Sequence, residues 1–69
     1  MIINDTKRLG GAIRKQRKSL GLSQFDAAGL CGVGERFLSE LERGKLTAEL
    51  GKVIQVLNRL GLRLALLDP

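Results

Sequence analysis

Glycines divide this chain of 69 residues into short segments, in most of which apolar residues recur at helical spacing. Gly21, Gly44 and Gly61 each follow the last apolar residue of a segment, which is where helices commonly end. The run Gly32-Val33-Gly34 is too rich in glycine to continue a helix and predicts a tight turn. The sequence therefore predicts four short helices, and a chain of this length has room for only one domain.

Polar residues that can cap a helix precede three of these segments. Asn4 or Asp5 can cap the first, and Ser23, followed three residues later by Asp26, resembles a capping box for the second. Thr47 can cap the fourth. We predict helices that run from about residue 5 to 20, from 23 to the turn at 32–34, from 35 to 43 and from 47 to 60.

The last residues follow a different pattern. Residues 62–66 place Leu at every second position, with Arg63 and Ala65 between, as a strand does, although Leu and Ala are poor strand formers. A lone strand has no partner for its backbone groups, so it would have to pair with a second copy. The alternatives are that the tail extends the fourth helix or lies irregularly on the core. The expected fold is an all-α domain of four to five helices over 1–61, with a C-terminal β-strand in 62–69 that pairs across a dimer.

The residue types that are missing exclude several classes of protein. The chain has no His and a single Cys, so it lacks the ligand clusters of zinc sites and the Ser-His or Cys-His pairs of nucleophilic catalysis. No apolar run is long enough to cross a membrane. We expect a cytoplasmic binding protein that is not an enzyme, with no metal, no cofactor and no membrane partner.

Positive charge is concentrated near the start of the chain. The net charge is +5, and residues 1–18 hold six basic residues against one acidic residue, Asp5. A clustered basic face is typical of proteins that bind a polyanion. The alternative is a solvated helix face that serves solubility.

Two short helices joined by a glycine-rich turn are the layout of a helix-turn-helix. The motifs within that layout are Leu22-Ser23-Gln24, Ala27-Ala28, Gly32-Val33-Gly34, Leu38-Ser39 and Leu41-Glu42-Arg43-Gly44-Lys45, preceded by Ile13-Arg14, Arg17 and Gly21. With this spacing, residues 9–60 closely resemble the Cro/repressor-type (XRE-like) DNA-binding domain. The resemblance implies a lambda-repressor-like fold that binds double-stranded DNA at a palindromic operator, with the second helix of the motif in the major groove.

The residues expected to contact base edges project from the outer face of the helix predicted over 35–43, because Leu38 and Leu41 point inward. Arg36 can donate two hydrogen bonds to guanine, and Glu35 or Glu40 can accept one from the amino group of cytosine. The alternative role of Glu40 is an ordinary surface pair with Arg36, four residues earlier. The expected base-reading set is Glu35, Arg36, Ser39 and Glu40.

Phosphate contacts are expected from other positions. Ser23 and Gln24 stand at the start of the second helix, where backbone N–H groups and the helix dipole favour an anion. Other candidates are basic residues at the end of the third helix and on the first. The expected phosphate-binding set is Ser23, Gln24, Arg43, Lys45, Arg14 and Lys18.

Two charged residues are expected inside the fold. Arg17 lies at the edge of the apolar stripe of the first helix, and Glu42 follows Leu38 by four residues. Periodicity places both near the core. The family resemblance implies that they pair there in a buried salt bridge.

A second resemblance concerns the C-terminal segment. Residues 57–68 resemble the end of HipB-like antitoxins, with a Leu-Gly-Leu turn followed by an alternating stretch. This resemblance implies an antitoxin of a type II toxin-antitoxin operon that represses its own operon and binds a HipA-like serine/threonine kinase toxin. The alternatives are a stand-alone XRE-type repressor, phage-like or chromosomal, and a protein-interaction module that uses the same fold.

A homodimer is expected because one such domain reads one half-site and symmetric pairs are the usual arrangement. The apolar positions of the fourth helix cover a sector about 160° wide, which is broader than one small core normally needs. The residues expected at the dimer contact are Val53, Val56, Leu60, Leu62, Leu64 and Leu66.

Overall fold

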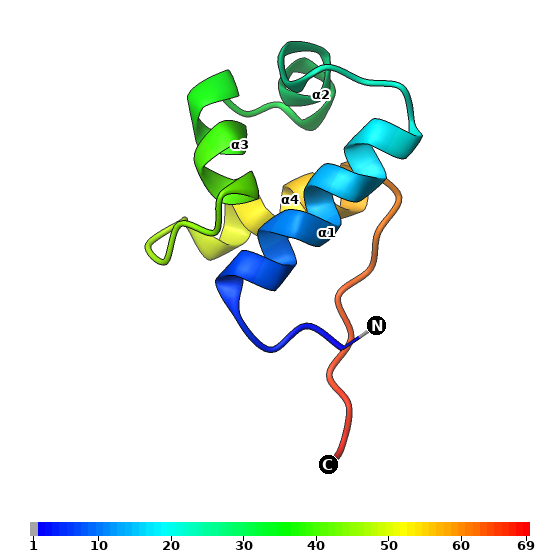
Figure 1. Ribbon diagram of the computed structural model, residues 1–69, viewed down its shortest axis with the longest axis vertical. Helices are drawn as coiled ribbons and strands as arrows, with labels where there is room; N and C mark the ends of the chain where they lie inside the picture. Colours follow the sequence, from blue (N-terminus) through cyan, green and yellow to red (C-terminus); the bar gives the residue numbers. More distant parts are fainter. Residues whose placement is uncertain (1) are drawn as a thin grey trace.

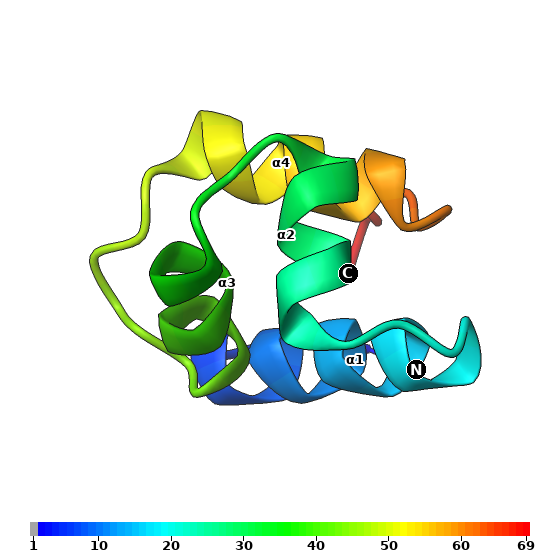
Figure 2. The same cartoon turned by 90° about the horizontal axis from the view of Figure 1, so that it is seen from above.

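The computed structural model describes residues 2–69, and within them the chain forms four helices and no strand. They are α1 (Thr6–Ser19), α2 (Gln24–Cys31), α3 (Glu35–Glu42) and α4 (Leu50–Arg59) (Figure 1). Seen from above, α1 and α4 lie on opposite sides of the domain, with α2 and α3 between them (Figure 2). The all-helical fold expected from the sequence is therefore confirmed.

Two of the predicted caps are confirmed. The Asp5 carboxylate accepts a hydrogen bond of 2.7 Å from the Arg8 N–H, and the Ser23 hydroxyl accepts one of 3.0 Å from the Asp26 N–H. The prediction for Thr47 is wrong: it lies in a turn, and α4 begins after Glu49, which makes no side-chain cap. The connection is longer than expected because Ala48 packs against the core before the helix starts.

The tail differs from the expected strand. Residues 62–69 are irregular; the Leu62 N–H donates to the Leu57 carbonyl over 2.8 Å, and Leu62 packs on the core. Beyond it, Leu64 and Leu66 are 57% and 95% exposed. Within residues 2–69 no strand forms, so the expected C-terminal strand is not supported and the tail takes the irregular alternative, with no sheet edge of the described residues beside it to satisfy its backbone. Figure 1 shows the tail leaving the domain on the side away from α2 and α3.

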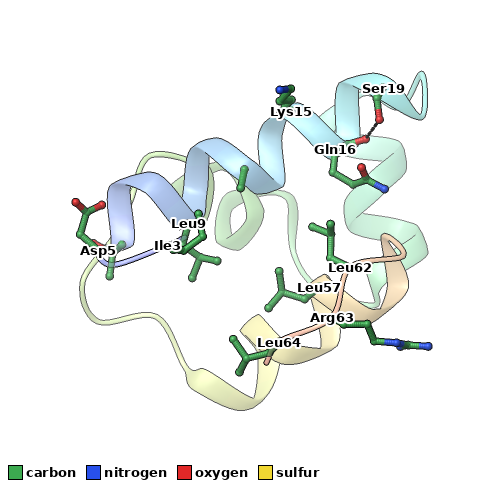
Figure 3. A pocket seen from close by; sticks show the side chains of 12 residues that line it. Ile3, Asp5, Leu9, Lys15, Gln16, Ser19, Leu57, Leu62, Arg63 and Leu64 are labelled. Carbon is green, nitrogen blue, oxygen red and sulfur yellow. Dashed lines mark hydrogen bonds between the residues drawn. The ribbon is translucent and has the colours of Figure 1, made fainter. Parts of the chain in front are cut away.

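The tail and α1 border an apolar groove (Figure 3). Its volume is about 680 Å³, and α1 and the preceding segment form one wall while Leu57 and the start of the tail form the other. The apolar side chains that line it are Ile3, Leu9, Ala12, Leu57, Leu62 and Leu64.

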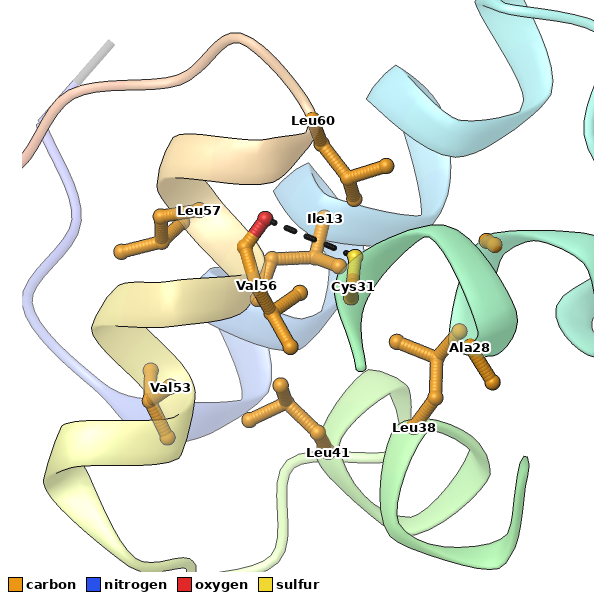
Figure 4. Close-up of a cluster of buried hydrophobic side chains, with 10 residues drawn as sticks. Ile13, Ala28, Cys31, Leu38, Leu41, Val53, Val56, Leu57 and Leu60 are labelled. Carbon is orange, nitrogen blue, oxygen red and sulfur yellow. Dashed lines mark hydrogen bonds between the residues drawn. The ribbon is translucent and has the colours of Figure 1, made fainter. Parts of the chain in front are cut away.

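The core is a cluster of small and medium apolar side chains drawn from all four helices (Figure 4). Val53, Val56 and Leu60 belong to it, with exposed fractions of 5%, 0% and 1%. Their expected place at a dimer contact is therefore corrected: these three side chains are buried in the core of the same chain, while Leu50 at the start of α4 stays 67% exposed.

Candidate nucleic-acid interface

The turn between α2 and α3 is held by hydrogen bonds on both sides. Gly32 adopts a φ of 71°, and the Val33 N–H donates to the Ala28 carbonyl over 3.0 Å. The Gln55 amide of α4 donates to the Cys31 carbonyl over 2.6 Å and so satisfies the end of α2. The angle between α2 and α3 is therefore set by contacts that do not depend on a ligand.

α3 presents two different faces. Leu38 and Leu41 are buried on the inner face, as expected. Glu35 and Arg36 are exposed on the outer face, while Ser39 and Glu40 are half-buried. The structure therefore brings the four expected base-reading residues together on the outer face of one helix.

The outer face of α3 carries a chain of charges. Glu40 lies 3.3 Å from the Lys45 ammonium and 4.0 Å from Nε of Arg36. The Arg36 side chain is 90% exposed. The Arg36 side chain thus extends into solvent with its Nε facing Glu40, whereas the less exposed Glu40 lies between two cations.

A polar hollow of about 430 Å³ lies where α1, α2 and α3 meet. Arg14 from α1 and Arg43 after α3 are its exposed cations. Three of the expected phosphate-binding residues therefore share one hollow with an expected base reader, and its full lining is Arg14, Arg17, Gln24, Ser39, Glu42 and Arg43.

The other expected phosphate contacts lie outside this hollow. Lys45 lines a shallower recess with Glu40 and Arg43. Lys18 is exposed near the end of α1, and Ser23 is exposed at the start of α2. The Ser23 oxygen already caps α2, which leaves its O–H as the group able to donate.

Beneath the hollow, Arg17 and Glu42 form a buried pair. Nε of Arg17 donates to Oε2 of Glu42 over 2.7 Å, and a second guanidinium nitrogen donates to Oε1 over 3.0 Å. The third nitrogen donates to the Leu22 carbonyl over 2.8 Å. The hydrogen bond to Glu42 raises the pKa of Arg17 above its ordinary value, although burial opposes the shift.

The structure adds to this pair a contact from Gln24 that the sequence analysis missed. Nε2 of Gln24 donates to Oε1 of Glu42 over 3.0 Å, so Gln24 is oriented by the pair. No periodicity predicts the contact, because the two residues are 18 positions apart and lie on different helices. The carboxylate of Glu42 therefore fixes α1, through Arg17, and the start of α2 at once.

Comparison with known proteins agrees with this geometry. The family described as "Helix-turn-helix" matches residues 13–67. Over 61 residues the chain is 48% identical to the "Uncharacterized HTH-type transcriptional regulator y4mF" of Sinorhizobium fredii (strain NBRC 101917 / NGR234), which covers 88% of this chain and 80% of that protein.

Solved structures share the fold. Chains of the structures described as "Structure of HipA-HipB-O2-O3 complex" and "HipB-O4 20mer complex" each superpose with a TM-score of 0.88. Each match covers 99% of this chain and 96% of the other at 24% identity. No helix in residues 2–69 is long and apolar enough to cross a membrane.

Proposed function

Because this chain belongs to the helix-turn-helix family of XRE-type transcriptional regulators, we propose that it represses its own operon as a HipB-like antitoxin. The observation that carries the DNA-binding part is the exposed outer face of α3 beside a hollow with two exposed arginines. The similarity in fold to chains of HipB complexes supports the antitoxin part. As in other regulators of this family, the expected role is binding and not catalysis.

Base reading rests on α3, which enters the major groove while α2 crosses the backbone. Arg36 is the principal reader, because its exposed guanidinium can donate two hydrogen bonds to O6 and N7 of guanine. Glu35 lies one position earlier and can accept from a cytosine amino group, and Ser39 can bond to either kind of base edge.

Phosphate binding rests on the hollow and on the residues around it. Arg14 and Arg43 flank one phosphate, and Gln24 contributes the amide hydrogen that Glu42 leaves free. The N-terminus of α2 adds its dipole beside Ser23. Lys45 and Lys18 contribute Coulombic attraction that does not depend on sequence.

Two substitutions separate base reading from phosphate binding. Arg36→Ala should cost about 1–3 kcal/mol at one base pair and leave binding to unrelated DNA nearly unchanged. Lys45→Ala should weaken binding to every sequence alike and reduce the salt slope by about one. Binding titrations at several salt concentrations, on the DNA upstream of its own operon and on a scrambled duplex, measure both. Equal losses of specificity in the two variants would contradict the assignment.

We propose that the protein acts as a homodimer on a palindromic operator, with a second copy covering the apolar groove of α1. Leu62 and Leu64 line the groove, and Leu66 beyond it is almost fully exposed. A symmetric pair of domains suits half-sites one helical turn apart.

The oligomeric state tests this contact. Leu66→Asp should shift sedimentation equilibrium toward the monomer, because it places a charge in a contact that is otherwise apolar. The matched control is Leu46→Asp, since Leu46 is 83% exposed in the connection between α3 and α4 and outside the groove. A wild-type monomer at micromolar concentration, or an unchanged dimer in Leu66→Asp, would contradict the proposal.

The toxin partner is tested separately. The tagged protein, expressed with its neighbouring genes, should copurify with a HipA-like serine/threonine kinase in stoichiometric amount. If the protein binds its upstream DNA and no kinase copurifies, the stand-alone repressor is the correct function. Absence of salt-dependent DNA binding would instead favour a protein-interaction module.

A further inference from the structure

Glu40 lies between two cations, Arg36 and Lys45, on the outer face of α3. Its side chain is only 28% exposed, whereas the neighbouring Arg36 side chain is 90% exposed. Oε2 faces Nε of Arg36 at 4.0 Å, and Oε1 accepts a hydrogen bond from the Lys45 ammonium over 3.3 Å. A single carboxylate thus lies between a proposed base reader and a proposed phosphate contact.

The backbone holds this arrangement in place. The Lys45 N–H donates to the Glu40 carbonyl over 3.1 Å, which closes the end of α3. Gly44 has a φ of 88° and is seated so closely on α1 that an added Cβ would lie 2.7 Å from Cα of Lys7. Thr6 donates to the Gly44 carbonyl over 2.9 Å. The position of Lys45 relative to Glu40 is therefore set by α1 as well as by α3.

From this geometry we infer that Glu40 is a positioning residue that raises sequence discrimination at the expense of general affinity for DNA. The inference rests on the proposed function. Glu40 keeps Arg36 aligned along the helix for guanine, and it competes with phosphates for Lys45. A direct contact between Glu40 and a base is disfavoured because each of its oxygens already faces a cation.

The charge balance explains why such a residue is useful. The chain has a net charge of +5, and positive charge attracts all DNA sequences alike. A carboxylate beside the groove-facing cations reduces that common attraction, while guanine recognition by Arg36 still depends on correct orientation. Discrimination is the difference between the two binding free energies, so lowering the common part leaves it unchanged, and the gain in discrimination comes from the alignment of Arg36 by Glu40.

Glu40→Gln tests the inference, since it removes the charge and nearly preserves the shape. The control is Glu49→Gln, which removes the same charge from an exposed pair with Lys52 before α4, 3.7 Å apart. Both variants and Arg36→Ala are used for selection of duplexes from a random pool. Their affinities are then measured on the wild-type-selected duplex and on its scrambled version, from about 50 to 200 mM salt.

We expect Glu40→Gln to bind the scrambled duplex more tightly at low salt. Its slope of log K against log salt should steepen by up to about 0.9, because Lys45 neutralises phosphate more fully once Glu40 no longer competes for it, so the gain should shrink by up to about threefold across the salt range. The ratio of selected to scrambled affinity should fall about fivefold or more. In the selected duplexes, Glu40→Gln should weaken the base preference at the same base pair as Arg36→Ala. The double variant should lose less discrimination, in free energy, than the sum of the two single losses.

Other results would overturn the inference. If Glu40→Gln weakens the base preference at a base pair where Arg36→Ala leaves the preference unchanged, Glu40 reads that base directly. If Glu40→Gln matches Glu49→Gln in slope and ratio, Glu40 has no role in discrimination. If the wild-type protein selects no sequence, the proposed function itself fails and the inference fails with it. Melting curves for every variant separate these outcomes from a loss of fold.

Discussion

Replacing Glu42 with Ala should unfold this domain or bring it close to unfolding. Glu42 and Arg17 have side-chain exposures of 2% and 8%, so little water reaches the pair. Among residues 2–69, the substitution leaves the Arg17 guanidinium with the Leu22 carbonyl as its acceptor and removes the hydrogen bond from the Gln24 amide to Glu42. An uncompensated buried charge is the costly consequence.

The magnitude follows from two estimates. Removing one partner of a buried ion pair costs about 3–5 kcal/mol. A domain of 69 residues is stabilised by roughly 3–10 kcal/mol in total, at about 0.05–0.15 kcal/mol per residue. The loss therefore takes between about a third and all of the free energy of unfolding. The start of α2 should be affected first, because Gln24 loses its hydrogen bond to Glu42.

Guanidinium denaturation followed by circular dichroism measures this effect. Glu49→Ala is the matched control, because its exposed pair should contribute less than about 1 kcal/mol. The double variant Arg17→Met/Glu42→Leu should recover most of the stability, since an apolar pair of similar volume removes the buried charge. An unfolding midpoint for Glu42→Ala equal to that of the wild-type protein would refute the reasoning.

Two further predictions concern packing and the thiol. Gly10→Ala should lower the free energy of unfolding by about 2 kcal/mol or more, because the new Cβ would lie 2.4 Å from the Leu41 carbonyl oxygen. Gly11→Ala, whose Cβ would have nothing within 4 Å, should raise the free energy of unfolding by up to about 1 kcal/mol. Chemical denaturation of the two variants measures both effects. Burial raises the pKa of the Cys31 thiol, against a smaller opposing effect of Arg59. The unfolded chain therefore loses this proton first, and stability should fall as pH rises above about 8.5. Denaturation between about pH 8 and pH 10 should show a steeper fall in the wild-type protein than in Cys31→Ala; equal slopes would exclude the thiol as the cause.

The α3 face was predictable from sequence because it depends on local spacing. Leu38 and Leu41 point inward at helical intervals, and this alone places Arg36 and Ser39 outward. The caps at Asp5 and Ser23 were predictable for the same reason, since each bond spans three residues. The prediction that Thr47 caps the fourth helix was wrong because Ala48 packs against the core and α4 begins only at Leu50.

The sequence by itself determined the four helices, their glycine stops and the position of the positive charge, because all three depend on neighbours within a few residues. Only the tertiary structure decided where the apolar surplus of α4 is used and how Gln24 is oriented, because both depend on helices that are distant in sequence. Val56 is buried by its own chain, while Leu66 is left exposed. The hydrophobic effect favours removal of an apolar side chain from water but has no direction. The arrangement of the helices therefore decides which surface covers that side chain.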